Sequence, residues 1–240
     1  MPEPAVEAAI TQLVIANRIL AREGVIDDFG HVSVRHPTNP GRYFLSRSRS
    51  PEIVVREDII EFTLEGEPIE QNGRAMYRER ALHGAVYIAR PEVNAVTHHH
   101  ARAVIPFGLT GRPLRAAFHM ASVIGHKVPV WDSQAEFGDT NMLIETMEQG
   151  QSMASAMEGE RCVLIRGHGA TCCGNSLREA VFVSVYLKEN AELVLQTLPL
   201  GEPNYLTAGE IDQTRAMLFS DMAQTRAWDY RAARAGFRGL

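Results

Sequence analysis

The sequence has no long apolar run: nowhere in its 240 residues does an uninterrupted hydrophobic stretch approach the roughly 20 residues that a helix needs to cross a bilayer. Its opening, "MPEPAVEAAITQLV", also lacks the basic segment followed by an apolar segment that is typical of a secretory signal. We therefore expect a protein without a membrane anchor that works in the cytoplasm.

Cysteine is scarce, with only Cys162, Cys172 and Cys173 in the chain. An odd count in which two cysteines are adjacent is a poor framework for structural disulfides, and the spacing matches no zinc site. We expect three reduced thiols, with the adjacent pair serving in packing rather than as activated thiolates.

Basic charge is not concentrated in any segment, and the formal net charge is −5. A nucleic-acid partner would require clustered basic residues, so we expect a small-molecule partner instead. The chain also lacks internal repeats and low-complexity linkers, and 45% hydrophobic residues can bury a sizeable core. These features predict a single domain over residues 1–240, with a C-terminal helical tail from about residue 205.

Hydrophobic periodicity divides the chain into three regions. Apolar residues recur with a helical period over residues 5–22, and Gly24 is expected to end that helix. β-prone runs follow and predict an antiparallel sheet region with "EGE" as a hairpin turn: "HVSVRH", "RYFLS", "EIVV" and "IIEFTLEGEPIE". Helices are then predicted at 76–89, 101–107, 140–157, 176–198 and 208–234, and strands at 92–100, 127–131 and 161–166. This order predicts a layered α/β or α+β fold around one sheet.

Three consecutive histidines, His98, His99 and His100, end one predicted strand. Because side chains alternate along a strand, His98 and His100 share one face and His99 points to the other. Two imidazoles on one face can converge on a metal ion. The alternative is that each is an ordinary hydrogen-bonded polar residue at a strand end.

Two further residues favour the metal site. His168 lies between Gly167 and Gly169 at the end of another buried strand, and glycines let the backbone approach an ion closely. Glu79 lies on the helix before the histidine strand. Three neutral imidazoles leave open positions on a divalent cation, and the carboxylate can either ligate the ion or move protons. These ligands do not choose between Mn, Zn, Fe and Co, of which we favour Mn or Zn.

Five segments together resemble the class II aldolase/adducin family over roughly residues 8–198: "GHVSVRHP", "EDIIEFTLEGEPI", "RERALHGAVYIARPEVNAVTHHH", "IGHKVPVWD" and "LIRGHGATCCGNSLREA". The resemblance implies a divalent metal held by His98, His100 and His168, and it assigns the family's catalytic glutamate to Glu79, with His83 following it. It also implies a layered α/β domain with a central, mostly antiparallel sheet flanked by helices. The expected assembly is a homotetramer with sites at subunit interfaces.

The chain departs from the sugar-phosphate aldolases of that family where they cradle a phosphate with small residues. It has large or cationic residues there instead: Gly30-His31, "FLSRSRSP" and Tyr77-Arg78. A cradle of backbone amides needs close approach, which Arg47, Arg49 and Arg78 would obstruct. Guanidinium groups bind carboxylates through paired hydrogen bonds, so we predict that these three arginines bind a carboxylate substrate. Arg49 has the alternative of decorating a surface turn.

A second departure lies at "AAFHMASVIG", where the aldolases resembled here carry a proton-donating tyrosine and this chain has Met120 beside His119. The alternative is drift in a loop. Both departures resemble the branch that decarboxylates hydroxymethylpyridine dicarboxylates and dihydroxyphthalates. The chain is therefore expected to be a metal-dependent decarboxylase of a hydroxylated aromatic or pyridine carboxylate, with the metal stabilising an enolate-like species. Glu79 or a histidine, with His31 and His119 as candidates, would protonate the ring carbon.

Three other functions remain open. The metal shell equally permits an aldolase or epimerase acting on a small sugar or hydroxy acid, and three histidine ligands also suit an Fe(II) oxygenase of the same family. Adducin-type domains keep the fold for protein association, but such a scaffold has no physical need for a complete metal shell.

Overall fold

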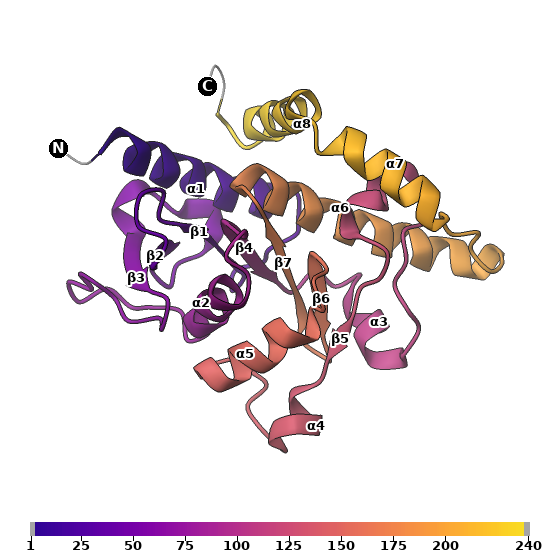
Figure 1. The fold of residues 1–240 in the computed structure, drawn as a ribbon, viewed down its shortest axis with the longest axis horizontal. Helices are drawn as coiled ribbons and strands as arrows, with labels where there is room; N and C mark the ends of the chain where they lie inside the picture. Colours follow the sequence, from indigo (N-terminus) through magenta and orange to yellow (C-terminus); the bar gives the residue numbers. More distant parts are fainter. Residues whose placement is uncertain (1–2, 238–240) are drawn as a thin grey trace.

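The computed structural model describes residues 3–237 and contains one seven-stranded sheet with the strand order β3-β2-β1-β4-β7-β6-β5 (Figure 1). The strands are β1 (His31–Arg35), β2 (Arg42–Ser46), β3 (Ile59–Thr63), β4 (Ala95–His99), β5 (Val130–Trp131), β6 (Cys162–Ile165) and β7 (Gly169–Gly174). Neighbouring strands are antiparallel except for the short parallel pair β5 and β6. The predicted mostly antiparallel sheet is confirmed.

Helices cover the sheet on both faces (Figure 1). The α-helices are α1 (Pro4–Arg22), α2 (Arg80–Ala89), α3 (Ile105–Thr110), α4 (Ser133–Phe137), α5 (Met147–Ala156), α6 (Leu177–Thr197), α7 (Ala208–Leu218) and α8 (Asp221–Arg234). Short 3-10 helices are η1 (Pro51–Ile53), η2 (Arg56–Asp58), η3 (His119–Ile124) and η4 (Leu198–Leu200). Helices α1 and α6 pack together against one face, and α2 and α5 pack together on the other. Within residues 3–237, no helix is both long and apolar enough to span a membrane.

Local signals in the sequence explain where several helices begin and end. Gly24 follows α1 with a φ of +64°, a left-handed conformation that glycine adopts without strain. Ser176 caps α6, since its Oγ accepts a hydrogen bond from the backbone N–H of Glu179 at 3.2 Å. Both predicted boundaries are confirmed.

The structure corrects several predicted elements. The "EIVV" run is not a strand: Glu52 and Ile53 lie in η1, which Pro51 begins because its fixed φ suits the first turn of a helix, and Val54 and Val55 follow in extended conformation. The "EGE" segment makes a tight turn, but only an isolated bridge between Phe62 and Pro68 follows it. The predicted C-terminal helix is two helices, because Ser220 caps α8 and thereby separates it from α7.

Strand β7, which lies between β4 and β6 in the centre of the sheet, was not predicted. Its residues, "GATCCG", include two glycines and no large β-branched side chain, so the segment resembles a loop. Gly169 is required by close packing: a Cβ there would lie 2.1 Å from the carbonyl oxygen of His99. The strand's small residues therefore allow β4 to approach it.

Candidate metal centre

Four side chains predicted from the sequence meet at one end of the central strands. His98 lies on β4, His100 follows that strand, His168 lies in the turn between β6 and β7, and Glu79 immediately precedes α2. Each offers a ligand atom, and these four atoms all lie within 4.8 Å of one another. Residues separated by up to about ninety positions in the chain thus form a group that could hold one metal ion.

The spacing of the ligand atoms fits a single divalent cation. The Nε2 atoms of His98 and His100 are 3.2 Å apart, and those of His100 and His168 are 3.0 Å apart. Oε2 of Glu79 lies 3.5 Å from His98 Nε2 and 3.8 Å from His168 Nε2. A tetrahedral ion with bonds of roughly 2.0–2.1 Å separates its ligand atoms by about 3.3 Å, which lies within this range.

Asp27 fixes the direction in which His100 presents its lone pair. The two carboxylate oxygens of Asp27 lie 3.1 and 3.2 Å from His100 Nδ1. An ionised carboxylate only accepts hydrogen bonds, so the proton of the neutral imidazole lies on Nδ1 and the lone pair lies on Nε2. That lone pair faces the other ligand atoms, as a metal ligand requires.

Asp27 was not found from the sequence. Partial burial acts to raise its pKa, but hydrogen bonds from the backbone N–H of Phe29 and the contact with His100 outweigh this effect and hold the pKa below its usual value. Asp27 lies in the turn before β1, and it reaches His100 because β1 pairs with β4. The sequence carries no signal for that pairing.

Burial keeps the imidazoles of His98 and His168 neutral. It lowers the pKa of His168 to about 4 and that of His98 well below its usual value. Burial also raises the pKa of Glu79 to about 7, against a hydrogen bond that its Oε1 accepts from the N–H of Ile144 at 3.0 Å. Neutral histidines are the form that binds a metal, and a carboxyl with a pKa near neutrality can exchange protons.

The glycines around His168 have distinct structural roles. Gly167 has a φ of +67°, a left-handed conformation that turns the chain sharply after β6. Gly169 allows the close approach to β4 described above. The two glycines therefore bring His168 to the end of β4, as the sequence suggested. His168 Nδ1 is buried and has no hydrogen-bond partner within the described part of the chain.

His99 points away from the cluster, as strand alternation predicts. It is fully buried, and its Nε2 lies 3.7 Å from the Sγ of Cys172 on the other face of the sheet. Cys172 and Cys173 are also fully buried. All three cysteines are free, and the adjacent pair packs in the core as expected.

His31, predicted as a catalytic candidate, lies next to the cluster. It pairs directly with His98 across β1 and β4, and the two ring centroids are 5.1 Å apart. Its ring also packs against Tyr77, with centroids 4.6 Å apart. Both side chains are buried.

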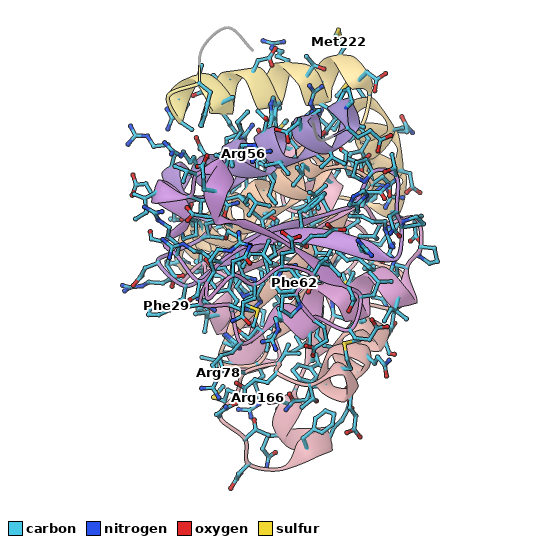
Figure 2. All side chains as sticks on the ribbon, turned by 90° about the vertical axis from the view of Figure 1, so that its left-hand side faces the viewer. Phe29, Arg56, Phe62, Arg78, Arg166 and Met222 are labelled. Atoms are coloured by element: carbon cyan, nitrogen blue, oxygen red, sulfur yellow. The ribbon has the colours of Figure 1, made fainter. Side chains whose placement is uncertain are left out.

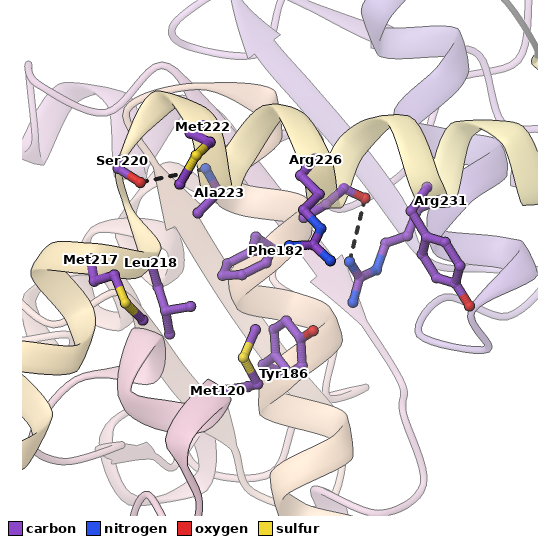
Figure 3. A pocket seen from close by; sticks show the side chains of 12 residues that line it. Met120, Phe182, Tyr186, Met217, Leu218, Ser220, Met222, Ala223, Arg226 and Arg231 are labelled. Atoms are coloured by element: carbon purple, nitrogen blue, oxygen red, sulfur yellow. Dashed lines mark hydrogen bonds between the residues drawn. The ribbon is translucent and has the colours of Figure 1, made fainter.

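His119, the other histidine candidate, lies on η3, which packs against α6 and α7. It is exposed, and its Nδ1 lies 3.3 Å from the Sδ of Met120. Met120 lines a cavity of about 520 Å³ together with Phe182 and Tyr186 (Figure 3), and none of the four residues of the metal cluster lines this cavity. His119 is not among the residues of the metal cluster.

The three predicted substrate-binding arginines all have acidic partners. Arg47 Nε lies 2.6 Å and Arg49 Nη1 lies 2.9 Å from the buried carboxylate of Asp58. Arg78 forms an ion pair with Glu145, and its side chain is 68% exposed at the surface of the molecule (Figure 2). Arg78 is thus the most accessible of the three for a ligand.

The family profile "Class II Aldolase and Adducin N-terminal domain" matches residues 11–195. The chain belongs to the class II aldolase/adducin family. Its solved relatives include an L-fuculose 1-phosphate aldolase from Glaciozyma antarctica, with a TM-score of 0.80 at 22% identity over 98% of this chain and 92% of that one. At that identity, the likeness establishes the fold alone.

Relatives of higher sequence identity include decarboxylases. The chain is 34% identical to "Decarboxylase tropJ" of Talaromyces stipitatus over 76% of this chain and 73% of the relative. It is 31% identical to a 3,4-dihydroxyphthalate decarboxylase of a Terrabacter species over 95% of this chain and 98% of the relative. These decarboxylases indicate a lyase-type enzyme.

Proposed function

We propose that the protein is a divalent-metal-dependent decarboxylase of a hydroxylated aromatic or pyridine carboxylate. Decarboxylases are among its relatives, and the match to the Terrabacter dihydroxyphthalate enzyme extends over nearly the full length of both chains. The complete group of Glu79 and three histidines favours an enzyme over a scaffold for protein association, since a scaffold needs no such group.

The packing of His31 against Tyr77 is the observation that favours a decarboxylase over a sugar-phosphate aldolase. His31 lies beside His98, with ring centroids 5.1 Å apart, and packs against Tyr77 at 4.6 Å. Both rings are buried, at positions where the aldolases resembled here carry small residues. A phosphate cradle is built from exposed backbone amides and small donors, for which these rings leave little room.

When bound, a divalent cation would supply Lewis-acid polarisation to the oxygens of a substrate carboxylate and its neighbouring hydroxyl. His98, His100 and His168 would hold that ion, with Asp27 orienting His100. Glu79, whose pKa burial raises to about 7 in the metal-free chain, would give a proton to the ring carbon after CO2 departs. Arg78 would bind a second carboxylate by exchanging its contact with Glu145 for the substrate.

We also propose a homotetramer. His119 is exposed on η3 and is not among the residues of the metal cluster. In a homotetramer with sites at subunit interfaces, as the resemblance implies, His119 would join the site of a neighbouring chain.

The test is a substrate screen on protein of known metal content. Metal is quantified in the purified protein, and ortho-hydroxylated aromatic and pyridine carboxylates are assayed for CO2 release. The expected result is release from at least one diacid, abolished by chelation and restored by Mn or Zn. Efficient cleavage of a phosphorylated ketose such as L-fuculose 1-phosphate, with all aromatic acids inert, would contradict the proposal and indicate an aldolase.

A further inference from the structure

A chain of four buried polar side chains runs inward from the metal centre. His31 Nδ1 lies 2.7 Å from His83 Nε2, and His83 Nδ1 lies 2.7 Å from Ser33 Oγ. Ser33 Oγ in turn lies 2.8 Å from the hydroxyl of Tyr87. None of the four residues is more than 1% exposed.

Two secondary-structure periods build this chain. His31 and Ser33 are two residues apart on β1 and face the same side of the sheet. His83 and Tyr87 are four residues apart on α2, which covers that side. The strand and the helix thus supply partners in turn, in the order His31, His83, Ser33 and Tyr87. The two inner side chains each contact both neighbours, His83 through its two ring nitrogens and Ser33 through its hydroxyl.

Core packing alone does not account for these residues. A buried hydroxyl or imidazole costs free energy unless it is hydrogen-bonded, and apolar residues of similar shape would fill the space without that cost. Burial lowers the pKa of His83 to about 3, so this imidazole is neutral and carries one proton. A neutral ring between two partners must donate to one of them and accept from the other.

The direction of the hydrogen bonds follows from the Tyr87 end. A phenol is a stronger donor than an aliphatic hydroxyl, which favours donation from Tyr87 to Ser33 Oγ; Ser33 then uses its single proton to donate to His83 Nδ1. His83 then carries its proton on Nε2 and donates it to His31 Nδ1. The proton of a neutral His31 consequently lies on Nε2, the ring nitrogen that does not take part in this series of hydrogen bonds.

We propose that His83, Ser33 and Tyr87 are positioning residues that fix His31 as a neutral donor with its proton on Nε2. His31 would then hydrogen-bond to a substrate oxygen on which negative charge develops, without itself gaining or losing a proton. The chain holds the donor in one orientation before the substrate arrives, which avoids reorganisation during the reaction. The catalytic part of this proposal rests on the proposed function, whereas the position of the proton on His31 does not.

The test combines NMR and kinetics on the zinc-loaded full chain. Two-bond 1H–15N correlation spectra of 15N-histidine-labelled protein report which ring nitrogen of His31 is protonated, with the signal assigned through His31→Gln. The wild type should carry the proton on Nε2. Tyr87→Phe removes only the hydroxyl at the inner end and should give a mixture of tautomers, with kcat lowered about tenfold, KM little changed and zinc content unchanged.

Tyr43→Phe is the matched control. Tyr43 packs in the same core, with its ring centroid 6.2 Å from that of His83. Its hydroxyl donates to the backbone carbonyl of Arg80, which is not part of the hydrogen-bonded series from His31 to Tyr87. This variant should keep the wild-type tautomer and kcat. Protonation of wild-type His31 on Nδ1, or a Tyr87→Phe variant with the wild-type tautomer and kcat, would overturn the proposal. Because the NMR measurement needs no substrate, it gives its answer even where no aromatic acid is decarboxylated.

Discussion

Asp27 and His100 contact each other on the edge of the imidazole that faces away from the other ligand atoms, with Asp27 Oδ1 3.1 Å from His100 Nδ1. A carboxylate in this position raises the basicity of a metal-binding imidazole and fixes its orientation. Asp27 is in turn held by the backbone N–H groups of Phe29 and Gly30, at 3.0 and 2.9 Å from its Oδ1. The turn before β1 therefore supports a ligand on β4.

We predict that Asp27→Asn weakens metal binding by about 10–100-fold, because the amide keeps an acceptor but loses the negative charge. Competition with a chromophoric chelator measures the dissociation constant. Asp28→Asn, at the exposed neighbouring position, is the control and should bind as the wild type does. Equal affinities for the two variants would mean that Asp27 does not tune the site.

Metal content tests which of the three consecutive histidines face the metal site. His98→Ala should lose bound metal, because His98 Nε2 lies among the ligand atoms. His99→Ala should retain it, because His99 contacts Cys172 on the other face of the sheet. Elemental analysis gives the metal per chain, and circular dichroism verifies folding. Retention by the first variant and loss by the second would invert the assignment.

The sequence predicts the four residues of the metal cluster better than the residues that support them, and the reason is physical. Strand alternation is a local rule, so the shared face of His98 and His100 follows from adjacent residues. The glycines beside His168 likewise act on their own backbone. Asp27 depends instead on how β1 pairs with β4, which short-range pattern does not specify.

The helices and strands divide in the same way, into elements that local pattern predicts and elements that depend on tertiary contacts. Helices α1 and α6 have long periodic patterns and clear caps, and the sequence predicts both. Strand β7 is central but built from small residues, so its identity depends on burial between two neighbours rather than on its own composition. The arginines show a further limit: charge predicts a substrate role for Arg47 and Arg49 and that role stays a prediction, but their pairing with Asp58 does not follow from local pattern.

Glu79→Gln should lower kcat by at least about a hundredfold, because the amide keeps the shape of the side chain but cannot exchange a proton. The amide can still interact with the N–H of Ile144 through its oxygen, so the fold should persist. Steady-state assays at saturating metal separate the loss of proton transfer from a loss of metal affinity. A variant with near-normal turnover would remove Glu79 from the chemistry.

Arg78→Lys should weaken binding of a dicarboxylate substrate by about 1.5–3 kcal/mol, since lysine keeps the charge but loses the planar pair of donors. Metal content should not change. Arg42→Lys is the control, because Arg42 is another arginine paired with a glutamate, Glu61, at 2.9 Å. Isothermal titration gives both affinities, and equal binding by the two variants would place the second carboxylate elsewhere.

Lowering the pH should destabilise the metal-free protein through His83. Its pKa falls from an ordinary value of 6.5 to about 3 in the folded state because the ring is buried. Between these values the unfolded chain binds a proton that the folded chain does not, so the free energy of unfolding decreases as the pH falls below 6.5. The His83 contribution to this loss should reach about 1.4 kcal/mol by roughly one pH unit below that point.

Urea unfolding of chelator-treated protein at about pH 7.5 and about pH 5.5 measures this loss. His83→Gln has no proton to gain, so its free energy of unfolding should decrease by about 1.4 kcal/mol less than that of the wild type over the same interval. His126→Gln controls for the removal of a histidine, because His126 is exposed and contacts Asp212 at the surface. It should follow the wild type. The prediction fails where His83→Gln shows the full wild-type loss, because the proton that destabilises the fold would then bind at other groups, such as His98 and His168, whose pKa values burial also lowers.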